Sequence, residues 1–306
     1  MRPTAFLRPA LLGLALLPLA ACEDAPDDPS AMVYTAATRD ALALLPQGAP
    51  VVAMLDVDEA ESVGAFRDAL AQFERAGGEA HARMGDLTRR TGFDPARDLD
   101  RVYFAVLDDE APLFVVQAKM DRERLIGFLD EQPEMERSAY RDLPVFTAVD
   151  DADRFTVALL SSDLAVAGLE RHVRAAADRA LDGGPSAATD AGLTAILDRA
   201  RYGEAWLVQR GGMPDQQDFQ VASGVVSMDF GADGVQVAAV AEPAAGASAA
   251  DLADALEGAV AMARVQAVDR PELREVLDDV DVRTRDGVVE VRGALSNSYL
   301  TQMQAR

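Results

Sequence analysis

Apolar residues recur along this chain with two different periods, and the change of period separates predicted helices from predicted strands. Between residues 61 and 76 they return every three or four positions, the spacing of an amphipathic helix that buries one face. At residues 101–107 and 113–118 the apolar runs are short and rich in β-branched and aromatic residues, with an acidic turn between them. These two runs predict a β-hairpin.

The first half of the chain alternates predicted helices and hairpins. The predicted elements are a helix at 39–45, a strand at 51–55, helices at 61–76 and 81–91, the hairpin at 101–118, a helix that opens at Asp121, a hairpin pairing 144–149 with 155–160, a strand at 164–167 and a helix at 169–181. Asp121 is a favourable N-cap, and Pro46, Gly77 and Gly92 stand where preceding helices would end.

The second half contains two Asp-Gly turn signals, Asp233-Gly234 and Asp286-Gly287, each between alternating apolar residues. Asp-Gly in this setting strongly favours a two-residue hairpin. The predicted elements are a helix at 190–201, a strand at 204–209, a hairpin pairing 221–230 with 235–241, a long helix at 248–268, a shorter helix at 271–277, a hairpin pairing 280–284 with 288–295 and a closing helix at 299–303.

The order of elements suggests two related units. Hairpin, helix, hairpin and helix follow one another in residues 101–181 and again, with a longer helical middle, in residues 221–303. We therefore expect an α+β fold of two similar units, each an antiparallel sheet with helices on one face. Gly183-Gly184-Pro185 marks the predicted boundary, which gives a first unit at residues 39–184 and a second at residues 185–306.

The N-terminus has the pattern of a secretion signal. Arg2 and Arg8 form a positive region, residues 10–19 are apolar, and small residues precede Cys22. The apolar segment is shorter than the roughly 20 residues that a membrane-spanning helix needs. We therefore expect residues 1–21 to be a signal peptide that is removed between Ala21 and Cys22.

The residues Leu19-Ala20-Ala21-Cys22 resemble the bacterial lipobox. This resemblance implies cleavage before Cys22, a diacylglycerol on its sulfur and acylation of its amine. Cys22 is the only cysteine, so it cannot form an internal disulfide, and several acyl chains on one residue make a stable anchor. The alternative is an ordinary secretory signal in which Cys22 lies near the cut by chance.

Residues 22–38 form the predicted tether. Residues 23–30 combine four acids with two prolines, a composition that stays extended and solvated. Residues directly after a lipidated cysteine influence which membrane bacterial lipoproteins reach, and Glu23 and Asp24 occupy those positions. The inner and the outer membrane both remain open as destinations.

The chain without its signal is strongly acidic. Removal of residues 1–21 leaves 285 residues with 27 basic and 52 acidic side chains, a formal charge of −25. This charge argues against nucleic acid as a partner, because nucleic-acid binding needs a basic face, and against docking on anionic lipid head groups. Genome composition or a salt-loving host explains such a surface; selection for a cationic partner or for divalent ions is the alternative.

No pattern in the sequence predicts a catalytic residue, a cofactor or a metal ligand. His81 and His172 lie on separate predicted helices without a second ligand at metal-binding spacing, so each is interpreted as a surface helix residue. The sequence has no Gly-x-Ser-x-Gly elbow, no phosphate-binding loop and no Ser-x-x-Lys at Lys119, its single lysine. Trp206 and the five tyrosines are dispersed and form no platform for sugars or bases, so packing is their expected role.

Four acidic clusters offer oxygen atoms of the kind that calcium and magnesium prefer. They are Asp56-Asp58-Glu59, Asp108-Asp109-Glu110, Asp150-Asp151-Asp153 and Asp278-Asp279-Asp281. None follows the spacing of an EF-hand loop. We interpret them as strand ends, turns and helix caps, where aspartate is favoured for backbone reasons, with weak divalent binding as the alternative.

Residues 44–52 read LLPQGAPVV, residues 92–94 read GFD and lead to DLDRV at 98–102, and residues 164–169 precede a predicted helix. Together these stretches resemble a family of uncharacterised bacterial envelope lipoproteins with repeated α+β units. The resemblance spans roughly residues 44–209. Its motifs are structural, and it carries over no functional residue.

Two functional hypotheses follow. The first is a non-enzymatic lipoprotein of the bacterial cell envelope, held at a membrane by its N-terminal lipid and acting as a binding or structural module for an envelope protein partner. The second is an envelope hydrolase that uses a carboxylate pair, with or without a divalent cation. A deep pocket with two carboxylates roughly 5–10 Å apart would favour the hydrolase.

Overall fold

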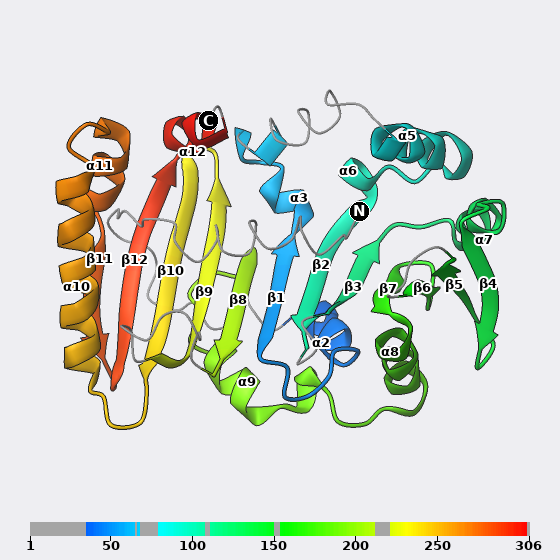
Figure 1. The fold of residues 1–306 in the computed structure, drawn as a ribbon, viewed down its shortest axis with the longest axis horizontal. Helices are drawn as coiled ribbons and strands as arrows, with labels where there is room; N and C mark the ends of the chain where they lie inside the picture. The colour runs from blue at the N-terminus through cyan, green and yellow to red at the C-terminus, as the bar shows by residue number, and fades with distance from the viewer. Residues whose placement is uncertain are drawn as a thin grey trace.

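Strands between residues 51 and 296 form one antiparallel sheet. The computed structural model describes residues 35–64, 66, 67, 79–107, 111–149, 154–211 and 221–304. Within them, twelve strands lie in the order β11-β12-β10-β9-β8-β1-β2-β3-β7-β6-β5-β4 (Figure 1). Their bounds are β1 Val51–Asp56, β2 Leu99–Val106, β3 Pro112–Ala118, β4 Met135–Tyr140, β5 Leu143–Ala148, β6 Phe155–Leu159, β7 Leu164–Leu169, β8 Ala205–Arg210, β9 Val221–Gly231, β10 Gly234–Pro243, β11 Asp281–Arg285 and β12 Val288–Ser296. The predicted α+β class is confirmed.

The two predicted units share this sheet, so the expectation of two separate sheets is wrong. β1, from the first predicted unit, pairs with β8 from the second, with Met54 opposite Trp206. Next to the predicted boundary, the Ala187 N–H donates to the Leu45 carbonyl (2.9 Å). Because β1 and β8 pair, their facing backbone N–H and C=O groups form hydrogen bonds. In two separate sheets, the same groups would be unpaired at open edges. The similarity of the two halves remains a prediction.

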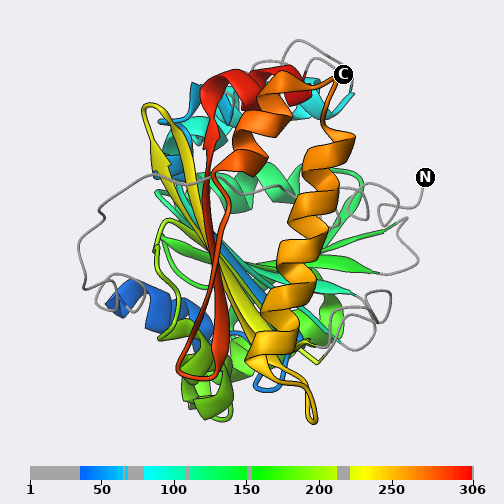
Figure 2. The same ribbon diagram turned by 90° about the vertical axis from the view of Figure 1, so that its left-hand side faces the viewer.

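Helices cover both faces of the sheet, which corrects the expectation of one covered face (Figure 2). Val240 and Val288 pack in a cluster with residues of α9, whereas Val289 and Val291, which point the other way, pack with α10. The helices are α2 Ala36–Leu42, α3 Val57–Ala60, α5 Glu79–Thr91, α6 Pro95–Asp98, α7 Arg122–Asp130, α8 Glu170–Asp182, the 3₁₀ helix η1 Ala187–Thr189, α9 Ala191–Leu197, α10 Ala249–Gln266, α11 Pro271–Asp278 and α12 Asn297–Gln304. The sheet is therefore the middle layer of three.

The largest core cluster lies on the face covered by α2, α8 and α9. Trp206, the single tryptophan, is 2% exposed and packs edge-on against Tyr103, with ring centroids 6.4 Å apart. This edge-to-face geometry is favourable because the positive edge of one aromatic ring meets the negative face of the other. The predicted packing role of Trp206 is confirmed.

Both Asp-Gly hairpins form as predicted. Asp286 and Gly287 have φ angles of 50° and 80°, the positive values that a type I′ turn requires, and they connect β11 to β12. Gly234 begins β10 with a φ of 147°, and a Cβ atom there would lie 2.0 Å from the Leu295 carbonyl oxygen. Only glycine lets β10 and β12 approach this closely.

The edge strand β4 was not predicted. Its sequence MERSAY has no apolar alternation, and the side chains of residues 136–139 are exposed. β11 is the opposite edge and carries Arg283 and Arg285, both exposed. Sequence periodicity detects a buried face, and an edge strand of this kind lacks one. Of the helix predicted at 61–76, only residues 61–64, 66 and 67 are described.

Candidate functional site

The predicted lipid-attachment site, Ala21 and Cys22, lies outside the described residues, as does the chain up to residue 34. Two of the four acidic clusters, at 108–110 and 150–153, also lie outside them. In the part that is described, no helix is both long enough and apolar enough to cross a membrane.

The acidic residues of the two described clusters serve as caps and ion-pair partners. Asp56, 6% exposed, accepts from the Glu59 N–H at the start of α3 (3.4 Å) and pairs with Arg101 (2.7 Å). Asp278 pairs with Arg264 (3.5 Å). No three His, Cys, Asp or Glu side chains of the described residues converge as metal ligands would. The caps and ion pairs support the structural interpretation of these two clusters.

The two histidines lie on different helices, His81 on α5 and His172 on α8. The side chain of His81 is outside the described part of α5. His172 is half-buried and its Nε2 accepts from Arg171 Nε (3.1 Å), so it is less exposed than the sequence suggested. The structure does not bring the two helices together.

An open groove of about 260 Å³ lies on the sheet face opposite α10, where the chain leaves α9. β10 and β12 contribute Ala238, Val240 and Val288 to its lining. Four arginines line it: Arg199, Arg201, Arg285 and Arg292. We call it the arginine groove. In a chain with a formal charge of −23, four arginines that line one groove are a local concentration of positive charge.

Three acidic residues also line the arginine groove, and two of them are paired. Glu290 accepts from Arg292 (2.9 Å), and Asp286, at the rim, lies 3.6 Å from Arg285. Asp198 is exposed at the C-terminal end of α9. Two of the three lining carboxylates are therefore engaged by arginines of the same groove.

A buried serine fixes the loop that carries Arg199 and Arg201. Ser227, 1% exposed on β9, accepts from the backbone N–H of Arg201 (3.1 Å) and of Tyr202 (3.3 Å). Ala200, between the two arginines, is 2% exposed in the core. Ser227 binds the backbone of this loop and Ala200 anchors it in the core. The sheet therefore fixes where the backbone of the loop places its two arginines.

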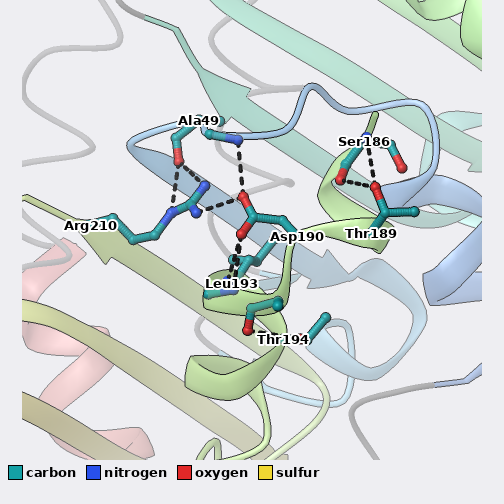
Figure 3. Close-up of polar contacts among 10 residues, drawn as sticks. Ala49, Ser186, Thr189, Asp190, Leu193, Thr194 and Arg210 are labelled. Atoms are coloured by element: carbon teal, nitrogen blue, oxygen red, sulfur yellow. Dashed lines mark hydrogen bonds and ion pairs between the residues drawn. The ribbon is translucent and has the colours of Figure 1, made fainter. Parts of the chain in front are cut away.

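A second polar cluster joins the start of β1, the start of α9 and the end of β8 (Figure 3). Asp190 accepts from Gly48 N–H (3.0 Å), from Leu193 N–H (3.2 Å) and from Arg210 (2.7 Å), and Arg210 also donates to the Ala49 carbonyl (2.7 Å). Burial acts to raise the pKa of Asp190, but these hydrogen bonds outweigh it and hold the pKa below its ordinary value. All of its partners are internal, so we assign this cluster a structural role.

Among the described residues, Glu204, directly before β8, is the carboxyl group whose pKa lies furthest from its ordinary value. Burial raises the pKa of Glu204 to about 7; the negative charges of Asp229 and Glu59 add to this, while the hydrogen bond from Phe230 N–H opposes it. A glutamate of this kind changes charge near neutral pH. It lies outside the lining of the arginine groove.

Comparison with known proteins identifies the fold and no family. No protein family and no curated protein matches the sequence. Three solved structures of TP0453 are similar: crystal form III (TM-score 0.55, 8% identity, covering 86% of this chain and 97% of that one), crystal form IV (0.52, 8%, 87% and 96%) and crystal form I (0.51, 10%, 90% and 98%). At such low identity the likeness shows that the fold is shared, and it assigns no site.

Sequence reasoning missed every arginine of the groove. It searched for histidines, nucleophiles and carboxylates, and arginine has no local motif in this chain. One signal was readable: Asp281 and Arg283 alternate along the strand predicted at 280–284, and Arg285 follows at the same spacing, which places the three residues on one face if the strand continues. That strand lies near Arg201 only because of the order of the strands in the sheet. Local sequence patterns do not reveal this order.

Proposed function

We propose that the protein is a lipid-anchored lipoprotein of the bacterial cell envelope that acts as a non-enzymatic binding module. The signal peptide at residues 1–21 is cleaved between Ala21 and Cys22, and the Cys22 sulfur carries the lipid. The anchor is supported by the positive region, the short apolar segment and the four-residue lipobox before the only cysteine of the chain.

The tether gives the folded body a defined reach from the bilayer. Residues 22–34 precede the described part of the chain, and thirteen extended residues span at most about 45 Å. A second envelope protein is the partner class that this placement favours. The choice between the inner and the outer membrane rests on Glu23 and Asp24 and belongs to the same proposal.

The arginine groove carries the binding role. It is an open site on a rigid sheet, and its carboxylates at 286 and 290 are paired with arginines rather than with each other. The alternative hydrolase needs one protonated and one ionised carboxyl group across a cleft. The groove supports binding better than it supports that chemistry.

The anchor is tested with Cys22→Ser. We expect the wild type to incorporate a labelled fatty acid and to sediment with membranes, and the variant to lose the label because it lacks the thioether sulfur. Ser30→Cys in the Cys22→Ser background is the matched control, since it restores a thiol away from the cleavage site. Equal labelling of wild type and Cys22→Ser would refute the proposal, as would full restoration by the control.

A further inference from the structure

Arg201 has an unusual environment for an arginine of this acidic chain. Its side chain is half-buried, and it makes no hydrogen bond or ion pair with any described residue. The other described arginines without a side-chain partner, Arg39, Arg67 and Arg270, are exposed to solvent. Burial of a charged group is costly unless it is paired, and arginine cannot lose its proton. Within the described part of the chain, the Arg201 side chain therefore has N–H donors available to a ligand in the groove.

The rest of the arginine groove adds to these donors. Arg292 uses one nitrogen on Glu290 and retains further N–H groups, and its side chain is 27% exposed. Arg199 is engaged by Glu242, outside the lining, so Arg201 and Arg292 are the half-buried cations available on the sheet face. The four arginines outnumber the three lining acids.

We infer that the arginine groove binds the oxyanion group of a small ligand, a phosphate ester or a carboxylate, with Arg201 as the principal contact. This inference rests on the proposed function: it gives the groove a small ligand of its own, in addition to the envelope protein partner. A planar guanidinium donates two parallel N–H bonds to either group, and such charge-assisted bonds are short and strong. Ala238, Val240 and Val288 give the remainder of the ligand an apolar surface.

The groove is smaller than a typical site for a drug-sized molecule, which suits a small ligand. Its volume of about 260 Å³ lies just below the range of roughly 300–1,000 Å³ typical of sites for drug-sized molecules. The backbone of Arg201 is already fixed by Ser227, so the ligand would order few additional groups on binding.

The test is titration of the full chain, extracted from membranes in a non-ionic detergent, with sodium phosphate and separately with sodium acetate. Sodium chloride keeps the ionic strength constant. We expect a saturable rise of the melting temperature with at least one anion, and at least tenfold weaker binding in Arg201→Gln. Arg201→Lys should bind with intermediate affinity because it keeps the charge and loses the paired N–H geometry. A response to phosphate alone would indicate a phosphoryl group, and a response to acetate alone a carboxylate.

The control is Arg270→Gln, which removes the same charge from an exposed arginine without a described partner. It should bind as the wild type does. Emission from Trp206 reports whether each variant is folded, and Arg292→Gln supplies a second test if Arg201→Gln does not fold. Absence of a saturable shift with both anions, or equal shifts in wild type and Arg201→Gln, overturns the inference. Membrane attachment is measured separately, so failure of the anchor would not be mistaken for failure of the site.

Discussion

Glu204 holds a proton at a pH where an ordinary glutamate has released it, because its pKa is raised from 4.5 to about 7. Between these two values the folded protein binds more protons than the unfolded chain, so its stability falls as pH rises through 7. We predict that Glu204→Gln stabilises the protein at pH 8 by about 1 kcal/mol, a value reduced for partial exposure, and has little effect at pH 5.

Thermal unfolding at both pH values measures this effect. Glutamine retains an acceptor for the Phe230 N–H, so the variant isolates the charge. Glu257→Gln, on the exposed side of α10, is the control for loss of a glutamate charge elsewhere on the surface. A Glu204→Gln variant that follows the wild-type pH profile would contradict the assignment.

Asp190 and Arg210 form a nearly buried pair whose partners come from three segments of the chain. We predict that Asp190→Ala lowers the free energy of unfolding by about 2 kcal/mol, because it leaves Arg210 and three backbone N–H groups without their acceptor. Asp190→Asn should cost less, since it keeps an oxygen at the same place. Denaturant unfolding compares the two; equal loss would show that the backbone hydrogen bonds contribute nothing.

At the scale of elements, two glycines make a matched pair with opposite expectations. Gly258 lies in α10 with nothing within 4 Å of the position that a methyl group would take, whereas a methyl group at Gly234 would collide with the backbone of β12. We predict that Gly258→Ala stabilises the protein by roughly 0.5–1 kcal/mol through helix propensity, and that Gly234→Ala destabilises it strongly. Melting temperatures check both; a Gly234→Ala protein as stable as the wild type would disprove the close approach of β10 and β12.

The elements that the sequence predicted well are those with a buried face or a turn signal. Ser248 was predicted as the start of the long helix and caps α10 through Asp251 N–H (3.1 Å), and Asp121 caps α7. β4 was not predicted because its side chains are mostly exposed. The arginine groove was not predicted for a related reason. Arg201, in a loop, and Arg292, on β12, are brought together by the strand order, which local sequence patterns do not encode.

At the scale of the whole molecule, the predicted boundary lies beside a continuous sheet. Gly183 and Gly184 are exposed and have positive φ angles, so this turn is accessible to a protease recognition sequence. We predict that cutting an inserted site there leaves the two pieces together, because β1 and β8 remain paired across the cut.

Size-exclusion chromatography and Trp206 fluorescence measure the outcome, since Trp206 lies on β8 opposite Met54 of β1. The uncut protein with the same insertion is the control. Separation into two folded pieces would show that the halves are independent units despite the shared sheet. The sequence pattern could not choose between these outcomes, because the partner of β1 lies far along the chain.

The open ends of the sheet have a consequence for crowding. β4 presents Glu136 and Arg137 to solvent, and β11 presents Arg283 and Arg285. Copies held side by side at one membrane, as the proposed anchor would hold them, face one another at high local concentration, where bare strand edges join readily. Charged side chains along both edges disfavour strand pairing between neighbouring copies. Dense packing on a bilayer is therefore compatible with copies that stay separate.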